Sequence, residues 1–147
     1  MASTSGRSEP GCPFCALDDP AVTVYADALV QALVSLRPIN QCHVIVVPRV
    51  HVEHFSDIAP ETMEAVMAAA QSVARAMISA AAPDGITYIT EDDLTGQGYN
   101  LVAHWKLHII ARFKADAVKL DWARQPDPGP IARARLASDI RHYLSAT

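Results

Sequence analysis

The alternation of apolar and polar positions predicts five β-strands. Segments 22–26 (VTVYA) and 28–36 (ALVQALVSL) are rich in apolar and β-branched residues, a composition typical of strands. The apolar segment 42–48 (CHVIVVP) is the strongest strand signal, and its closing proline suits a strand end. Two further strands are predicted at 86–90 (ITYIT) and 104–113 (HWKLHIIARF).

The period changes to that of a helix in two other segments. From Pro60 to Ala82 apolar residues recur at helical spacing, with proline at the first position and an acidic first turn. Residues 131–144 form a second amphipathic pattern after a proline-rich stretch. The sequence therefore predicts an α+β fold, in which a five-stranded antiparallel sheet is accompanied by one long central helix and one C-terminal helix.

Length and charge narrow the class of protein. The chain has 147 residues, half of them apolar, which fits one globular domain over 12–147 after a flexible lead at 1–11. No apolar run approaches the roughly 18 residues of a membrane span, and the polar N-terminus has no secretory signal. The net charge is −4 and the basic residues are scattered. We therefore expect a cytoplasmic protein that binds neither membranes nor nucleic acid.

The motif Cys12-Pro-Phe-Cys15 raises the question of a metal site. A C-x-x-C in a chain without a secretory signal suggests metal or redox chemistry, although two thiols without a partner remain the alternative. Zinc would need two more ligands to complete a tetrahedron. The available histidines are His43, His51, His54, His104, His108 and His142. His142 suits an exposed helix position and His43 a structural role at a strand start, and composition alone does not choose among the others.

The segment AHWKLHIIAR (103–112) places three nitrogen-bearing side chains at alternate positions. In a strand His104, Lys106 and His108 would point to one face and the intervening apolar side chains to the other. Such a row indicates a reactive centre, a former one, or a solvated strand face.

The order of these segments resembles the histidine-triad (HIT) family, in its bacterial zinc-containing branch. The resemblance rests on CPFCALDDPAVTVYAD, RPINQCHVIVVPRVHV, the long helix and HWKLHIIAR, and it extends over residues 12–145. It implies the HIT-like fold, a homodimer formed through the long helix and a strand, and nucleotide binding. It also implies a structural Zn²⁺ held by Cys12, Cys15, His51 and His104.

The resemblance makes Lys106 the most unusual residue of the chain. The family motif is His-φ-His-φ-His-φ-φ, where φ is an apolar residue and the middle histidine attacks the α-phosphate. Here His104 and His108 keep the outer positions, and Lys106 occupies the middle. Lys106 could act as a substitute nucleophile, as a charged clamp on phosphate, or as an ordinary lysine on a solvated face; we favour the clamp. The predicted catalytic residues are Lys106 and His108.

The predicted nucleotide-binding residues are Ser35, His43, Gln97 and Asn100. Ser35 stands where relatives often have an acidic or amide residue for the ribose, and His43 has a structural role as its alternative. Asn100 stands near the family's glutamine position, Gln97 precedes it, and Leu101 replaces a serine that contacts phosphate.

The resemblance implies a partner and two classes of function. We expect a purine nucleotide or related phosphate compound as ligand, with hydrolase or nucleotidyl-transfer activity on nucleoside phosphoramidates or dinucleoside polyphosphates. The alternative is a catalytically inactive module that senses nucleotides or binds another protein, because Lys106, Ser35 and Leu101 all depart from the family pattern.

Overall fold

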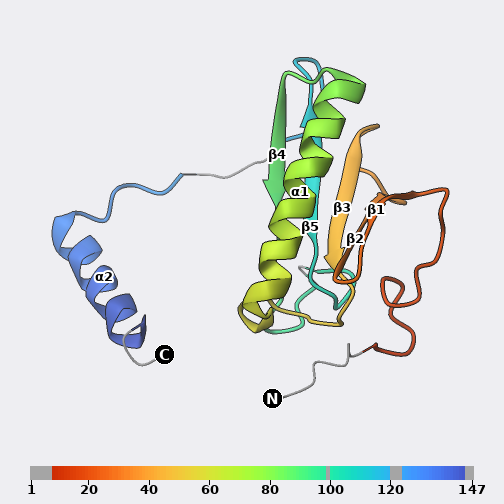
Figure 1. Ribbon diagram of the computed structural model, residues 1–147. Coiled ribbons are helices and arrows are strands. Elements are labelled where there is room, and N and C mark those ends of the chain that lie inside the picture. Colours follow the sequence, from red (N-terminus) through yellow and green to blue (C-terminus); the bar gives the residue numbers. More distant parts are fainter. Residues whose placement is uncertain (1–7, 99, 120–123, 145–147) are drawn as a thin grey trace.

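A five-stranded antiparallel sheet forms the centre of the protein (Figure 1). The computed structural model describes residues 8–98, 100–119 and 124–144. The strand order is β1-β2-β3-β5-β4, which makes β1 and β4 the edges. The strands are β1 (Thr23–Ala26), β2 (Val30–Val34), β3 (His43–Pro48), β4 (Gly85–Ile89) and β5 (Leu107–Arg112).

The long helix α1 (Pro60–Ala81) covers one face of this sheet. Proline at the start leaves no unpaired N–H there, and the helix ends where Ala82 adopts a left-handed conformation with φ +43°. Its apolar side packs on side chains of the sheet, among them Leu107 and Ile109, and on Trp105 just before β5. This layer is the main hydrophobic core.

The opposite face of the sheet has a smaller apolar cluster. Leu33, Ile45 and Val47 are buried there, and side chains from the N-terminal segment, including Phe14 and Leu17, pack against them. His108 is the register partner of Ile45 and therefore shares this second face. The second face therefore carries the predicted site residue His108.

The predicted strand at 104–113 is too long at its N-terminal end. β5 begins only at Leu107, so His104 and Lys106 precede the strand. The cause lies in the hydrogen bonding of the neighbouring backbone: Trp105 donates its N–H to Val52 O, beyond the end of β3. The alternation nevertheless continues through this segment, since Trp105, Leu107 and Ile109 all belong to the core against α1. The strand predicted at 28–36 is likewise shorter, Val30–Val34.

The C-terminal helix α2 (Pro130–Leu144) stands away from the sheet and α1 (Figure 1). None of its residues is buried. The predicted α+β fold with a five-stranded antiparallel sheet and two helices is confirmed. Among the described residues no helix is both long and apolar enough to span a membrane. Residues 1–7 of the predicted flexible lead lie outside the described residues.

Candidate functional site

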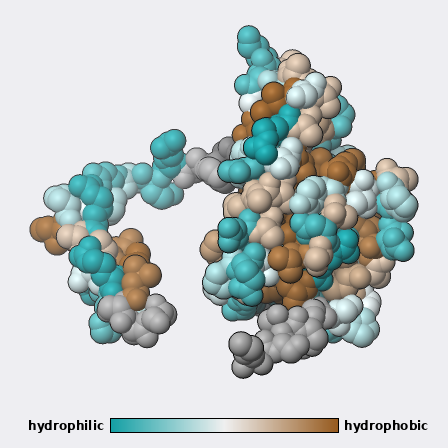
Figure 2. Space-filling view, viewed as in Figure 1, coloured by the Kyte–Doolittle hydropathy of each residue, from teal (hydrophilic) through white to brown (hydrophobic). Residues whose placement is uncertain are grey.

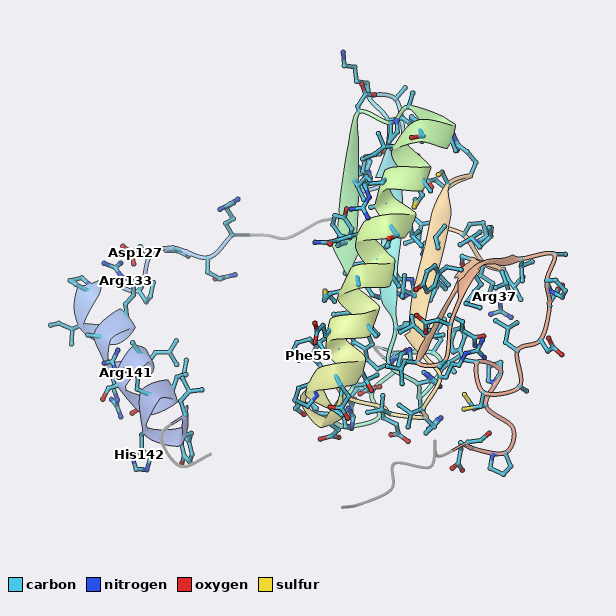
Figure 3. All side chains as sticks on the ribbon, in the orientation of Figure 1. Arg37, Phe55, Asp127, Arg133, Arg141 and His142 are labelled. Carbon is cyan, nitrogen blue, oxygen red and sulfur yellow. The ribbon has the colours of Figure 1, made fainter. Side chains whose placement is uncertain are left out.

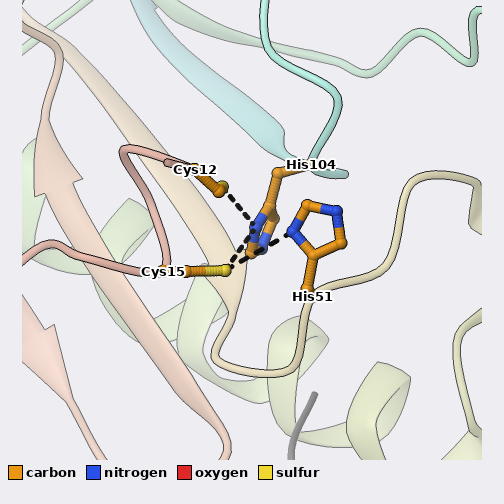
Figure 4. Close-up of side chains that lie close together, drawn as sticks. All are labelled: Cys12, Cys15, His51 and His104. Atoms are coloured by element: carbon orange, nitrogen blue, oxygen red, sulfur yellow. Dashed lines mark hydrogen bonds between the residues drawn. The ribbon is translucent and has the colours of Figure 1, made fainter. Parts of the chain in front are cut away.

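Two cysteines and two histidines from distant parts of the chain converge beside the sheet (Figure 4). Cys12 Sγ lies 3.4 Å from His104 Nδ1, and Cys15 Sγ lies 3.4 Å from His51 Nδ1 and 3.7 Å from His104 Nδ1. All four candidate ligand atoms lie within 4.8 Å of one another. His104 is completely buried and His51 half-buried.

These distances fit a tetrahedral metal ion. Bonds of about 2.3 Å to sulfur and about 2.0 Å to nitrogen place neighbouring S and N ligands roughly 3.5 Å apart in a tetrahedron. His104 Nε2 donates to Pro48 O at 2.9 Å, which leaves the Nδ1 lone pair directed at the thiols. Burial lowers the pKa of His104 to about 4, and the neutral imidazole is the form that binds metal. The donor set therefore fits Zn²⁺.

The ligands are held by their own neighbours. His51 Nε2 lies 3.7 Å from Glu53 Oε1, so a carboxylate stands behind this ligand. Phe14, between the two cysteines, packs edge-on against the His104 ring at 5.6 Å between centroids. Burial is also the main cause of the raised pKa of the Cys15 thiol. His43, His54, His108 and His142 do not belong to the cluster.

Lys106 is buried next to this cluster. It is only 7% exposed, so the interpretation as a solvated surface lysine is wrong. Its Nζ donates to Val102 O at 2.9 Å and to Asn100 Oδ1, and it lies 5.5 Å from the centre of the Phe14 ring. Burial lowers the pKa of Lys106 to about 8, against the opposing effect of Cys12 and Glu91.

His43 and His108 form a hydrogen-bonded pair across β3 and β5. Ile39 N–H donates to His43 Nδ1 at 3.1 Å, so the proton of neutral His43 lies on Nε2. That atom is 2.9 Å from His108 Nδ1 and donates to it, which places the proton of neutral His108 on its Nε2. Burial lowers the pKa of both histidines, that of His108 to about 4. His108 Nε2–H has no hydrogen-bond partner among the described residues.

The other predicted nucleotide-binding residues are distributed unevenly. Buried Ser35 lies beside His43, since its N–H donates to His43 O at 2.9 Å. Asn100 contacts Lys106 directly. Gln97 is exposed in a loop where Asp93 accepts the N–H groups of Gln97 and Gly98. Within the described ranges no hydrogen bond connects Gln97 with Lys106 or His108.

Sequence reasoning missed three partners of these residues. Pro48 O and Val102 O are backbone atoms, which carry no sequence signal. Phe14 was visible inside the C-x-x-C motif, and its position between two ligands could have indicated that it packs on the site.

Comparisons with known proteins show the family and the fold of this chain. The HIT domain family matches residues 16–115. A crystal structure of a HIT family member from Bacillus subtilis superposes with a TM-score of 0.81 at 26% identity, covering 90% of this chain and 96% of that one. A zinc-bound histidine triad family protein from Mycobacterium smegmatis gives a TM-score of 0.65 at 27% identity, covering 93% and 98%.

A relative whose name states an enzyme activity matches this chain over about half of its own length. The bifunctional bis(5′-adenosyl)-triphosphatase/adenylylsulfatase of Arabidopsis thaliana is 31% identical over 103 residues, which are 70% of this chain and 56% of that protein. The family match covers most of the chain, including the sheet, α1 and the segment 103–112. The chain belongs to the HIT domain family.

Proposed function

We propose that this protein binds a purine nucleotide, or a related phosphate compound, on the sheet face opposite α1. The observation that carries the proposal is the buried Lys106, held in place two residues from His108 on the same side of the chain. The buried apolar cluster of Leu33, Ile45 and Val47 lies on this same face, under side chains of the N-terminal segment that include Phe14 and Leu17. Ser35 and His43 border it at the ends of β2 and β3.

Lys106 acts in this proposal as a cationic clamp in the middle position of the triad. Its ammonium has three N–H bonds, of which Asn100 and Val102 take two. The third is left for a phosphate oxygen. A charged donor in a buried site binds an anion more strongly than one in water. His108 Nε2–H adds a second donor, because the His43 hydrogen bond fixes that tautomer.

The metal is structural in this proposal. Zn²⁺ held by Cys12, Cys15, His51 and His104 would cross-link the N-terminal segment to the sheet. Four protein ligands leave no open coordination position. The cross-link positions Phe14, whose ring lies beside both His104 and Lys106.

The proposed reaction is hydrolysis or nucleotidyl transfer on nucleoside phosphoramidates or dinucleoside polyphosphates. With adenosine 5′-phosphoramidate, water would form the new P–O bond and the P–N bond would break to release AMP and ammonia. The bis(5′-adenosyl)-triphosphatase activity named for the Arabidopsis relative supports this class of substrate.

Exposed apolar side chains on α1 and β4 suit a homodimer of two single-domain chains. Met67 and Ile78 on α1 and Tyr88 on the edge strand β4 are large apolar side chains with exposed fractions of 40% to 53%. An unpaired edge strand with exposed apolar neighbours is a surface that proteins usually cover. We propose that a second copy pairs along α1 and β4.

One observation favours the alternative, an inactive nucleotide-sensing or protein-interaction module. The backbone N–H groups of Thr95, Gln97 and Gly98 donate to the carboxylate of Asp93 and therefore do not point outward to a phosphate. Leu101, at the position of the family's phosphate-contacting serine, is 87% exposed.

AMP binding and AMP release from adenosine 5′-phosphoramidate test the proposal on the zinc-loaded protein. We expect Lys106→Met to weaken AMP binding by tenfold or more, since a charge-assisted hydrogen bond contributes about 1.5–3 kcal/mol, and to reduce release in proportion. Exposed Lys114→Met is the matched control and leaves both unchanged. Release that survives Lys106→Arg supports the clamp, while loss of release with AMP still bound would favour a nucleophilic lysine. AMP binding without release from the parent protein would favour the inactive module.

A further inference from the structure

The helix α2 carries an apolar stripe that the single chain leaves uncovered. Leu136, Ile140 and Tyr143 recur at helical spacing, and their exposed fractions are 61%, 52% and 73%. Figure 2 shows hydrophobic atoms on the side of α2 that faces the globular part across an open gap. Three arginines and one aspartate give α2 a net positive charge. Of the arginines, Arg133 lies beside the stripe and also pairs with Asp127.

A helix of this length needs a surface to pack on. α2 has 15 residues, which is close to the length of about 12–15 residues below which isolated helices are marginal in water. In proteins the packing of an apolar stripe supplies most of the stability of such a helix. The stripe therefore indicates a docking surface elsewhere.

A complementary surface lies at the N-terminal end of α1. Phe55, in the short 3₁₀ turn before α1, is 53% exposed, and its ring rests on buried Trp105 at 6.1 Å between centroids. Acidic side chains surround it: Asp92 accepts the Phe55 N–H at 3.1 Å. Glu53, Asp57 and Glu61 line one open cavity of about 1310 Å³ beside it. We call Phe55 with these four carboxylates the Phe55 surface.

We propose that α2 of one copy docks on the Phe55 surface of a second copy, so that a helix of net positive charge meets a surface with four carboxylates. The apolar stripe would cover Phe55, and charges of opposite sign would meet at the rim. Figure 3 shows Phe55 at the base of α1 on the side toward which α2 projects, with Arg133 and Arg141 on α2. The proposal rests on the homodimer part of the proposed function, because pairing along α1 and β4 brings the second copy to this side.

The connection between β5 and α2 is long enough for this exchange. Residues 113–129 separate Arg112 from Pro130, and an extended chain spans roughly 3.3 Å per residue, so these residues reach on the order of 50 Å. That distance exceeds the diameter of a small domain, about 30 Å. α2 can therefore leave its own domain and reach the neighbouring copy.

Isotope-resolved photocross-linking of the full chain tests the docking. Chains carrying p-benzoylphenylalanine in place of Phe55, one batch labelled with ¹⁵N and one unlabelled, are unfolded, mixed, refolded with zinc and irradiated. We expect linked peptides that join position 55 to α2, half of them combining the two isotopes. Links to α2 that never combine isotopes would mean docking within one chain and would overturn the proposal, as would the absence of links to α2.

Matched variants test the role of the stripe. Ile140→Asp is expected to reduce the link to α2 at least tenfold. Ile131 is 86% exposed and lies about 180° from Ile140 around the helix. Ile131→Asp is therefore expected to retain the link, and equal effects of the two variants would overturn the proposal.

Sedimentation of the same samples separates the causes of failure. A dimer without links refutes the docking alone, a monomer refutes the homodimer as well, and AMP titration reports the nucleotide proposal independently.

Discussion

Two pairs of buried or half-buried histidines in this protein differ in their hydrogen bonding. In the first, Nδ1 atoms of His51 and His104 converge on two thiols at 3.4–3.7 Å, with the opposite ring nitrogens turned to Glu53 and Pro48 O. In the second, His43 and His108 hydrogen-bond to each other and to a backbone N–H. The first pair, together with the two thiols, directs four metal-binding atoms to one point. The second pair leaves the His108 Nε2–H free to donate to the proposed ligand.

The difference shows how context assigns the same side chain to different chemistry. Burial lowers the pKa of one histidine in each pair, His104 and His108, to about 4. What separates them is the partner of each ring nitrogen: converging thiols fit a cation, while a histidine pair with a fixed tautomer fits an anion at its free N–H. Three predictions test this distinction.

Removing one thiol has the largest expected effect. Cys15→Ser should abolish stabilisation by zinc, which at a free zinc concentration of 1,000 times Kd amounts to about 4 kcal/mol. For a chain of this size that corresponds to a Tm lower by roughly 8–16 °C. Thermal unfolding with and without a chelator measures the change, and Cys42→Ser, outside the cluster, is the control. If the two variants respond equally to zinc, the cluster does not bind it.

The second pair should make stability depend on pH. The pKa of His108 is about 4 in the folded protein and about 6.5 when it is unfolded, so the unfolded chain binds its proton first as the pH falls. The stability contributed by neutral His108 is therefore complete above pH 6.5 and is lost toward pH 4, by roughly 3 kcal/mol for the full range. Urea unfolding at several pH values should show a shallower decline for His108→Gln. Parallel declines would contradict the prediction.

The smallest expected effect concerns the carboxylate behind a metal ligand. Glu53→Gln keeps the shape of the side chain and removes the charge 3.7 Å from His51 Nε2. Because such outer partners typically contribute 10–100-fold to metal affinity, we expect a loss of about tenfold for this exposed contact. Competition with a chromophoric chelator measures it, and exposed Glu64→Gln is the control. An unchanged affinity would show that Glu53 does not orient His51.

Much of the fold followed from local patterns. The β-branched segment ending at Pro48 and the helical spacing from Pro60 predicted β3 and α1 almost to the residue. The alternation of Trp105, Leu107 and Ile109 predicted which side chains face the core. The start of β5 was predicted three residues too early, because a strand end depends on whether a neighbouring strand still offers hydrogen bonds.

The sequence by itself determined most of the secondary structure, the identity of the reactive side chains and the unusual lysine between His104 and His108. Only the tertiary structure decided how these side chains are paired. Cys12 and His104 are 92 residues apart in sequence yet in contact, and the partners of His104 and Lys106 include the carbonyls of Pro48 and Val102. Backbone carbonyls are the same in every residue, so which of them meets a buried side chain depends on the packing of strands and loops and not on local sequence.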